Sequence, residues 1–275
     1  MKTTAYRYPN EQLILSITIL LVLVVVAITA TATVCLSVVF IAFFVGYAYY
    51  ASRANHQELI RRAEPVSSEN SQHSALMRDL MVLVRQGVAR LRPGPIEVFI
   101  APSRQLNAYT FGLSSPKVVV LFSPLLQVMD RDELMFILGH ELGHVSLGHT
   151  WLNTLIGGMS GIPSPGAASA ILVLAFLSWT RACEYSADRA GLLACGRLEK
   201  AITALIKLEA PSADTRAELE EAYRQIDAED DSFLSNITEA LGTHPMLIRR
   251  ITELRRFAGT SSCRRLQELV NQNPA

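Results

Sequence analysis

Histidine and glutamate residues stand at metal-ligand spacing in one short stretch of this 275-residue chain. The stretch reads ILGHELGHVSLGH, from Ile137 to His149, and contains His140, Glu141 and His144. Residues four apart share one face of a helix, so two imidazoles at this spacing can bind one Zn²⁺ from the same side. Glu141 is about 100° around the helix from His140, which suits a carboxylate acting on a water held by the metal. The pattern is typical of a zinc hydrolase helix.

A catalytic zinc site needs a third protein ligand besides the two histidines, and the chain offers two candidates. On a continuing helix His149 would lie about 180° from His140, so we expect a structural or surface histidine rather than a ligand. Glu184 and Asp188, in RACEYSADRAG, are four apart and share one helical face. Glu184 can complete a His₂Glu site, and Asp188 can accept a hydrogen bond from a ligand imidazole. Taken alone, these acidic residues also fit an ordinary solvated helix face.

A long uncharged segment near the N-terminus indicates a membrane anchor. No charged residue occurs from Leu13 to Tyr50. A helix of that length would measure roughly 57 Å at about 1.5 Å per residue, whereas one membrane crossing needs about 20 residues. We therefore expect two spans, at about 13–30 and 34–50. Basic residues flank both ends, which predicts a hairpin with both ends in the cytoplasm. Ala30-Thr31-Ala32 resembles a signal-peptide cleavage site, but a second apolar run follows it at once.

The remaining pattern predicts the organisation of the chain. We expect a membrane hairpin over residues 1–51, a polar linker over 52–74 and one domain over 75–275. Strand patterns, over 96–103 and twice within 107–126, are flanked by long helices instead of alternating with them, which predicts a mostly helical α+β domain with a small sheet. Helices are expected at about 74–91, from a capping pair Asp130–Glu133 onward, and at about 197–209, 214–228, 245–257 and 262–271.

A second uncharged run, from Trp151 to Thr180, is divided by two prolines. If His140 and Glu184 meet at one metal, they lie on the same side of the bilayer, so this run must cross it an even number of times. Its two halves are short for a span of about 20 residues. We expect an apolar hairpin insertion at about 151–180 that is re-entrant or interfacial, or a buried helix.

Bulk composition argues against other classes of protein. The formal net charge is zero and no Lys/Arg cluster is dense, so nucleic acid is not an expected partner. The four cysteines lack paired CxxC spacing, which argues against a zinc ribbon or a redox motif.

Several segments together resemble the HtpX and CAAX prenyl protease family of membrane zinc metallopeptidases, a gluzincin group, and in particular its bacterial HtpX-like members. The segments are NAYTFGL, KVVVLF, DELMFILGHELGHVSLGH, RACEYSADRAG and THPMLIRRI, over about 107–251. The resemblance implies a zincin-like metalloprotease domain with one Zn²⁺ per chain. It implies His140, His144 and Glu184 as zinc ligands, Glu141 as general base and Asp188 as a hydrogen-bond partner behind the ligands.

The same resemblance implies roles for residues outside the metal site. His244, in Thr-His-Pro, matches a position that steadies the transition state, and Arg250 matches the arginine of the same motif. Pro245 next to His244 also fits a simple helix start. Asn107 and Ala108 match a motif on an edge strand that can pair with extended substrate, although a plain structural hairpin fits equally well.

The resemblance implies a membrane-anchored zinc-dependent metalloendopeptidase that cleaves proteins or peptides, including misfolded membrane proteins, in protein quality control. The expected location is the bacterial inner membrane, with several spans in contact with the lipid bilayer and the catalytic domain on the cytoplasmic side. Two alternatives stay open. One is a CAAX-type prenyl protein protease, although that branch resembles a much longer, multi-span chamber. The other is a catalytically silent membrane scaffold of the same fold, against which the intact Glu141 argues.

Overall fold

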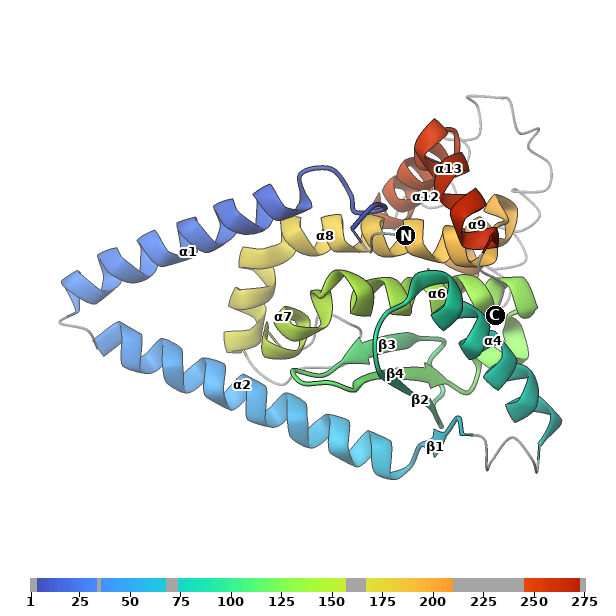
Figure 1. The fold of residues 1–275 in the computed structure, drawn as a ribbon. Helices are drawn as coiled ribbons and strands as arrows, with labels where there is room; N and C mark the ends of the chain where they lie inside the picture. The colour runs from blue at the N-terminus through green and yellow to red at the C-terminus, as the bar shows by residue number, and fades with distance from the viewer. Residues whose placement is uncertain (1–3, 34–35, 68–73, 157–166, 210–244, 273–275) are drawn as a thin grey trace.

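The computed structural model describes residues 4–33, 36–67, 74–156, 167–209 and 245–272. The described chain is mostly helical, with one small mixed sheet (Figure 1). His244 and the helix expected at 214–228 lie outside the described residues.

Helices account for most of the described elements. They are α1 (Glu11–Ala32), α2 (Leu36–Arg61), α4 (Ala75–Leu91), α5 (Leu125–Val128), α6 (Arg131–Leu147), α7 (His149–Ile156), α8 (Ala167–Cys195), α9 (Leu198–Glu209), α12 (Pro245–Ala258) and α13 (Ser261–Asn271). The apolar periodicity of the sequence locates both ends of α4, α9, α12 and α13 to within one residue.

The sheet has four strands in the order β1-β2-β4-β3. The hairpin expected within 107–126 is confirmed, since β3 (Ala108–Phe111) pairs antiparallel with β4 (Lys117–Phe122). Strand β2 (Ile96–Ala101) runs parallel to β4, and the two-residue β1 (Glu64–Pro65) pairs antiparallel with β2. Within the described sheet, β3 is therefore an edge strand.

The two faces of the sheet meet different parts of the molecule. Val98, Val119 and Leu121 face the main core, which the sheet shares with α4, α6, α8, α9, α12 and α13. Alternate residues such as Val120 form a second buried cluster on the opposite face, and Leu59 of α2 packs against it. Helix α2 therefore continues to Arg61, well into the region expected to be a linker, because its last turns cover the sheet.

Helices α6 and α8 pack closely through small residues. A Cβ atom on Gly139 would lie 2.4 Å from the Cβ of Ala194, and one on Gly143 would lie 2.6 Å from the Cβ of Ala190. Any larger side chain at these positions would push the two helices apart. The close approach places the histidines of α6 beside the acidic residues of α8.

The ends of α6 are set by local sequence. The expected capping pair is confirmed: Asp130 Oδ1 accepts the backbone N–H of Glu133 at 3.0 Å, and Glu133 Oε2 accepts that of Asp130 at 2.8 Å. The helix ends at Gly148, whose φ of 78° is favourable for glycine. The chain turns there, and His149 begins the separate helix α7.

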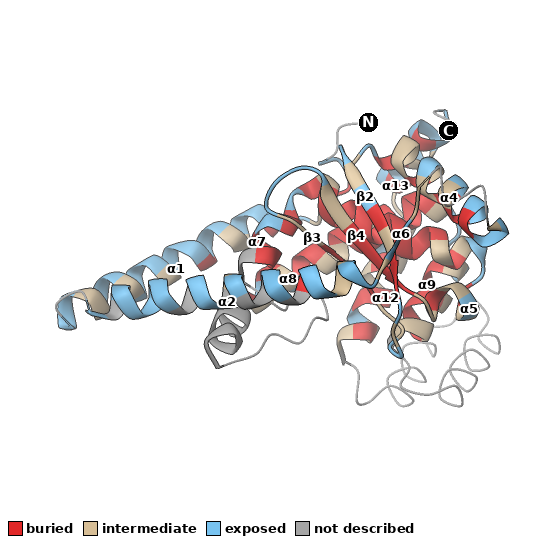
Figure 2. Ribbon diagram, turned by 90° about the horizontal axis from the view of Figure 1, so that it is seen from below, coloured by how far each residue is buried: buried red, intermediate tan, exposed pale blue. Residues whose placement is uncertain are grey.

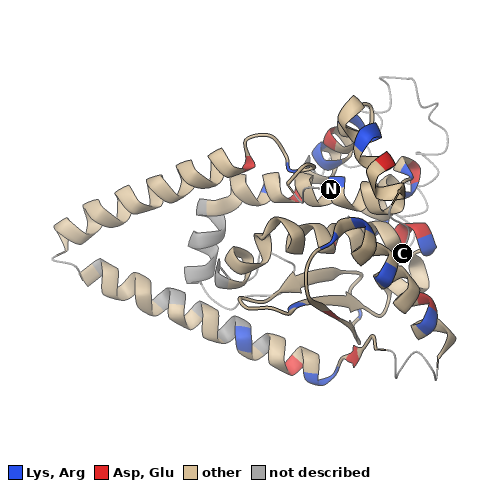
Figure 3. Ribbon diagram, viewed as in Figure 1, with Lys and Arg blue, Asp and Glu red and all other residues tan. Residues whose placement is uncertain are grey.

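Helix α1 is the one helix in the described ranges that is long and apolar enough to cross a membrane. It ends at Ala32, close to the turn expected between two spans, and α2 follows from Leu36. The two helices project from the rest of the molecule and are largely exposed (Figures 1 and 2). Figure 3 shows that most of their length is free of charged residues, as the sequence in these helices requires.

Candidate active site

Three side chains from α6 and α8 converge as expected for a metal site. The Nε2 atoms of His140 and His144 lie 3.2 Å apart. Glu184 places Oε2 3.5 Å from the first Nε2 and Oε1 3.5 Å from the second. Ligands bound tetrahedrally to zinc at about 2.0–2.2 Å are themselves about 3.3–3.6 Å apart. The spacing and the His₂Glu donor set therefore fit one zinc ion.

The three donors line a cavity of about 590 Å³. Glu141 is buried in the same wall, next to His140 on α6. Asn107 and Ala108 of the β3 edge line the cavity as well. The structure thus brings the expected metal ligands, the expected general base and the expected substrate-binding strand to one cavity.

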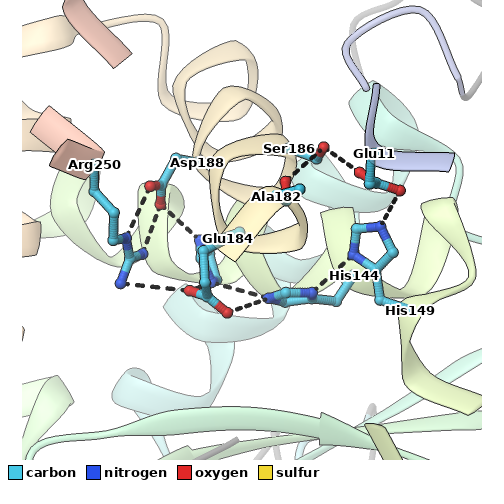
Figure 4. Close-up of polar contacts among 9 residues, drawn as sticks. Glu11, His144, His149, Ala182, Glu184, Ser186, Asp188 and Arg250 are labelled. Atoms are coloured by element: carbon cyan, nitrogen blue, oxygen red, sulfur yellow. Dashed lines mark hydrogen bonds and ion pairs between the residues drawn. The ribbon is translucent and has the colours of Figure 1, made fainter. Parts of the chain in front are cut away.

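His140 is oriented by a carboxylate and an arginine. Asp188 Oδ1 lies 2.9 Å from His140 Nδ1, on the side of the ring away from the metal donors (Figure 4 shows Asp188). An ionised carboxylate can only accept a hydrogen bond, so Nδ1 carries the proton and Nε2 keeps its lone pair for a metal. Arg250 donates to both oxygens of Asp188, at 2.9 and 2.6 Å, and its Nη1 lies 3.4 Å from Glu184 (Figure 4).

The charges around the site favour a cation. Burial opposes ionisation of Glu184 and Asp188, but Arg250 and the hydrogen bonds of His140 hold the pKa of both carboxyls below their usual values. Burial likewise disfavours charge on His140, yet these two carboxylates raise its pKa to about 10. The negative field that would hold a proton on His140 also attracts a divalent cation. Burial raises the pKa of Glu141 above that of an ordinary glutamate, an effect that both histidines partly offset.

His144 is oriented by a different route. Its Nδ1 lies 3.0 Å from Nδ1 of His149, and His149 Nε2 lies 3.1 Å from Oε1 of Glu11 (Figure 4). The expectation that His149 is structural and not a ligand agrees with this geometry, but a surface position is wrong, since only 1% of the residue is exposed. The helical projection assumed a continuing helix, whereas α6 ends at Gly148 and α7 turns the imidazole back toward His144. Burial lowers the pKa of His149 to about 4, so this imidazole is neutral.

Sequence reasoning did not assign a role to Glu11 or Ser186. Glu11 is the last charged residue before the apolar run, and that position was the one available signal. Ser186 lies two residues after Glu184 on α8 and hydrogen-bonds Glu11 (Figure 4). Arg250, expected near substrate, lines the cavity but makes its described ion pairs with Asp188 and Glu184.

Comparison with known proteins agrees with this geometry. The model of peptidase family M48 matches residues 67–258. Plastoglobule-localized metallopeptidase 48 of Arabidopsis thaliana is 27% identical over 212 residues, covering 71% of this chain and 61% of the relative. Protease HtpX of Acinetobacter baumannii strain AYE is 25% identical over 244 residues, covering 75% and 78%.

A shorter similarity links the chain to a CAAX prenyl protease. A CAAX prenyl protease 1 homolog of Dictyostelium discoideum is 39% identical over 51 residues, which are 18% of this chain and 12% of the relative. The family match, in contrast, spans well over half of the chain and includes the helices that carry His140, His144 and Glu184. This protein belongs to peptidase family M48.

Proposed function

We propose that this protein is a membrane-anchored zinc metalloendopeptidase with a zincin-like catalytic domain. The observation that carries the proposal is the convergence of His140, His144 and Glu184 at zinc-ligand spacing, with Glu141 beside them on the wall of one cavity. A scaffold without turnover has no use for a buried carboxylate at that position, because burial without a partner costs free energy. The CAAX-type activity has less support, because the similarity to the CAAX prenyl protease 1 homolog covers only 51 residues.

The mechanism follows from what these side chains can do. His140, His144 and Glu184 would hold a zinc ion, which would supply Lewis-acid activation of a water and of the scissile carbonyl. Glu141 takes the proton from the attacking water and later delivers it to the leaving amine. Burial raises the pKa of Glu141, which favours uptake of that proton. We assign His244 to stabilisation of the developing oxyanion.

The edge strand is the proposed binding site for the substrate backbone. Strand β3 pairs with β4 on one side, and its residues Ala108 and Thr110, together with the preceding Asn107, line the cavity that contains the metal donors. An extended peptide that adds to this edge places its backbone across the metal site through main-chain hydrogen bonds. Arg250 lines the same cavity, and we assign it to substrate binding as well. The substrate class is therefore an unfolded or extended protein segment, consistent with quality control of misfolded membrane proteins.

The membrane arrangement is proposed from composition and exposure. Leu20 and Ile28 of α1 and Phe43 of α2 are all more than half exposed, so these apolar helices are not core helices. We propose that both cross the bilayer as a hairpin, with the catalytic domain on the cytoplasmic side because basic residues flank both ends. Glu11 is buried against the catalytic domain, which favours a retained anchor over a cleaved signal peptide. The division at residues 51 and 74 and an interfacial segment over 151–180 remain predictions.

The test compares wild type with Glu141→Gln, each purified in detergent as the full chain. Zinc per chain is measured by elemental analysis, and cleavage is measured with casein as an unfolded substrate, with and without chelator. We expect one zinc in both proteins and cleavage by wild type alone, lost on chelation. The exposed Glu199→Gln, in the first turn of α9, is the matched control and should behave as wild type.

Other results would contradict the proposal in different ways. Zinc in both proteins without cleavage of casein or of an unfolded membrane protein by wild type favours the silent scaffold. Cleavage confined to a prenylated peptide favours the CAAX-type activity. Absence of zinc from wild type overturns the ligand assignment itself.

A further inference from the structure

A buried hydrogen-bond chain joins the first residue of α1 to one side of the candidate metal site. It runs from Glu11 through His149 to His144, with nitrogen–oxygen and nitrogen–nitrogen distances of 3.1 and 3.0 Å (Figure 4). Glu11 and His149 are each 1% exposed. Neither belongs to the three donors that face the cavity, so the mechanism above leaves their conjunction unexplained.

The direction of the hydrogen bonds in this chain is fixed by the carboxylate. An ionised Glu11 can only accept, so Nε2 of His149 carries the proton. A His144 that offers the lone pair of Nε2 to a metal carries its ring proton on Nδ1, so Nδ1 of His149 must be the acceptor. With its proton on Nδ1, His144 keeps the lone pair of Nε2 toward Glu184 and His140. In the opposite tautomer of His149, the lone pair of Nε2 would face the carboxylate of Glu11, and the N–H at Nδ1 would face the N–H of His144.

Glu11 is held in place as an ionised acceptor by Arg7, which precedes α1, and by Ser186 of α8. Arg7 forms an ion pair with Oε1, and the hydroxyl of Ser186 hydrogen-bonds Oε2. The backbone N–H of Tyr8 donates to the same Ser186 hydroxyl oxygen at 2.7 Å. Ser186 is completely buried on α8, only two residues from the proposed ligand Glu184.

The segment that precedes α1 is fastened to the helices of the site. Arg7 Nη2 donates to the carbonyl oxygen of Leu147, in the last turn of α6, at 2.9 Å. Arg189 of α8 donates to the carbonyl oxygen of Arg7 at 3.2 Å, and its guanidinium lies 5.0 Å from the centre of the Tyr8 ring. Tyr8 also contacts Tyr185, with ring centres 4.9 Å apart. The start of the proposed membrane anchor is therefore docked directly behind His144.

We propose that Glu11, acting through His149, is a positioning residue that fixes the tautomer and orientation of His144 for metal binding. The inference rests on the proposed function, because it concerns the zinc affinity of that site. It makes the metal site depend on docking of the segment that leads into the first membrane helix. Hydrogen-bond partners of this kind typically change metal affinity by about 10- to 100-fold when they are removed.

The test measures the zinc dissociation constant of the full chain in detergent, by competition with a fluorescent chelator. His149→Met removes the acceptor for His144, whereas His149→Gln has a similar volume and keeps an oxygen acceptor. We expect about 10- to 100-fold weaker binding for His149→Met and largely restored binding for His149→Gln. Glu11→Ala should weaken binding by itself but add little in the His149→Met background, because both changes interrupt the same chain. The exposed Glu199→Ala is the control for loss of a carboxylate.

Packing alone predicts a different pattern. A merely structural role would lower the melting temperature of both His149 variants in the metal-free protein and leave zinc affinity equal in the two. It would also make the effects of the Glu11 and His149 changes on zinc affinity additive. That pattern overturns the inference while leaving the proposed metal site intact. If His149→Met does not fold, zinc affinity is compared among wild type, Glu11→Ala and Glu11→Ala/His149→Gln. A merely structural role would leave the affinity equal in these three proteins, and that result would overturn the inference.

Zinc stoichiometry separates two further outcomes. Two zinc ions per wild-type chain, one of them lost in Cys183→Ser, would make Glu11, His149 and the nearby Cys183 a second metal site and overturn the positioning role. A wild-type chain that binds no zinc would overturn the proposed function itself, and the inference with it.

Discussion

The two histidines of the candidate metal site are held by different parts of the chain. His140 is held from one side by Asp188 of α8, which is in turn held by Arg250 of α12. His144 is held from the other side by His149 of α7, which reaches Glu11 at the start of α1. One support is a direct carboxylate contact, and the other is relayed through a second imidazole.

The difference shows which parts of the chain the site depends on. Asp188 and Arg250 lie inside the region that matches the peptidase family, residues 67–258, whereas Glu11 lies outside it. The support of His140 is therefore available to the catalytic domain alone. The support of His144 requires the segment that begins the proposed membrane anchor.

Removal of a ligand should abolish the site, whichever support stands behind it. In His144→Ala one of three donors is lost, so we expect zinc per chain to fall from one to near zero at micromolar free zinc, with loss of cleavage. Elemental analysis after dialysis checks the expectation, and far-ultraviolet circular dichroism checks that the fold persists. Full zinc occupancy in this variant would show that the ion binds elsewhere.

Loss of the direct support should cost more than loss of the relayed one. Asp188→Asn removes the charge that faces both His140 and the buried Arg250, so we expect zinc affinity to fall by about 100-fold, the upper end of the usual range. The free energy of unfolding of the metal-free protein should fall by about 3 kcal/mol, because a buried ion pair loses one partner. Denaturant titration and chelator competition measure the two effects.

The matched control for this prediction is Asp132→Asn. Asp132 pairs with Arg197 at 2.7 Å on the surface, where ion pairs contribute about 0–1 kcal/mol. If Asp188→Asn weakened zinc binding less than His149→Met does, the direct contact would not be the stronger support, and the comparison would reverse.

Separation of α6 from α8 should weaken both supports together. A Cβ on Gly143 would lie 2.6 Å from the Cβ of Ala190, so Gly143→Ala forces the helices apart at an expected cost of about 1–3 kcal/mol in the free energy of unfolding. Zinc affinity should fall as well, because Glu184 moves with α8. Gly46→Ala, with nothing within 4 Å of the added Cβ, is the control and should not destabilise the protein, because alanine has the higher helix propensity. A wild-type melting temperature and zinc affinity in Gly143→Ala would contradict the close packing.

Loss of the helix cap should leave both supports unchanged. Asp130→Ala removes the N-cap of α6, three turns from the histidines, and should cost about 1 kcal/mol without changing zinc affinity. Against the effect of burial, Lys200 and backbone N–H groups lower the pKa of Asp130 in the folded protein. The cap therefore stabilises fully above the unfolded pKa of about 3.9, and its contribution disappears as the pH falls through the lower folded value. Thermal melts of variant and wild type should differ at pH 7 and converge in strong acid.

Local patterns in the sequence were sufficient to predict several elements. The Asp130–Glu133 capping box, the β3–β4 hairpin and the ends of four helices depend on neighbouring residues, and all are confirmed. The structure also brings together His140, His144 and Glu184 as the motif spacing indicated. Local patterns did not predict features that depend on partners elsewhere in the chain. The linker over 52–74 contains the last turns of α2 and strand β1, because both cover or extend the sheet.

The sequence alone was therefore sufficient to predict the candidate metal donors, the candidate general base and the carboxylate behind His140. His140 and His144 are four apart on one helix, as are Glu184 and Asp188 on another, a spacing that local geometry fixes. The link between the two pairs came from the resemblance to a known family. The support of His144, in contrast, follows from tertiary packing. Its support joins residues 11, 149 and 186, and no periodicity relates positions so far apart. Their meeting depends on a break at Gly148, which local sequence sets, and on the packing of α1 against α7 and α8, which is set by burial.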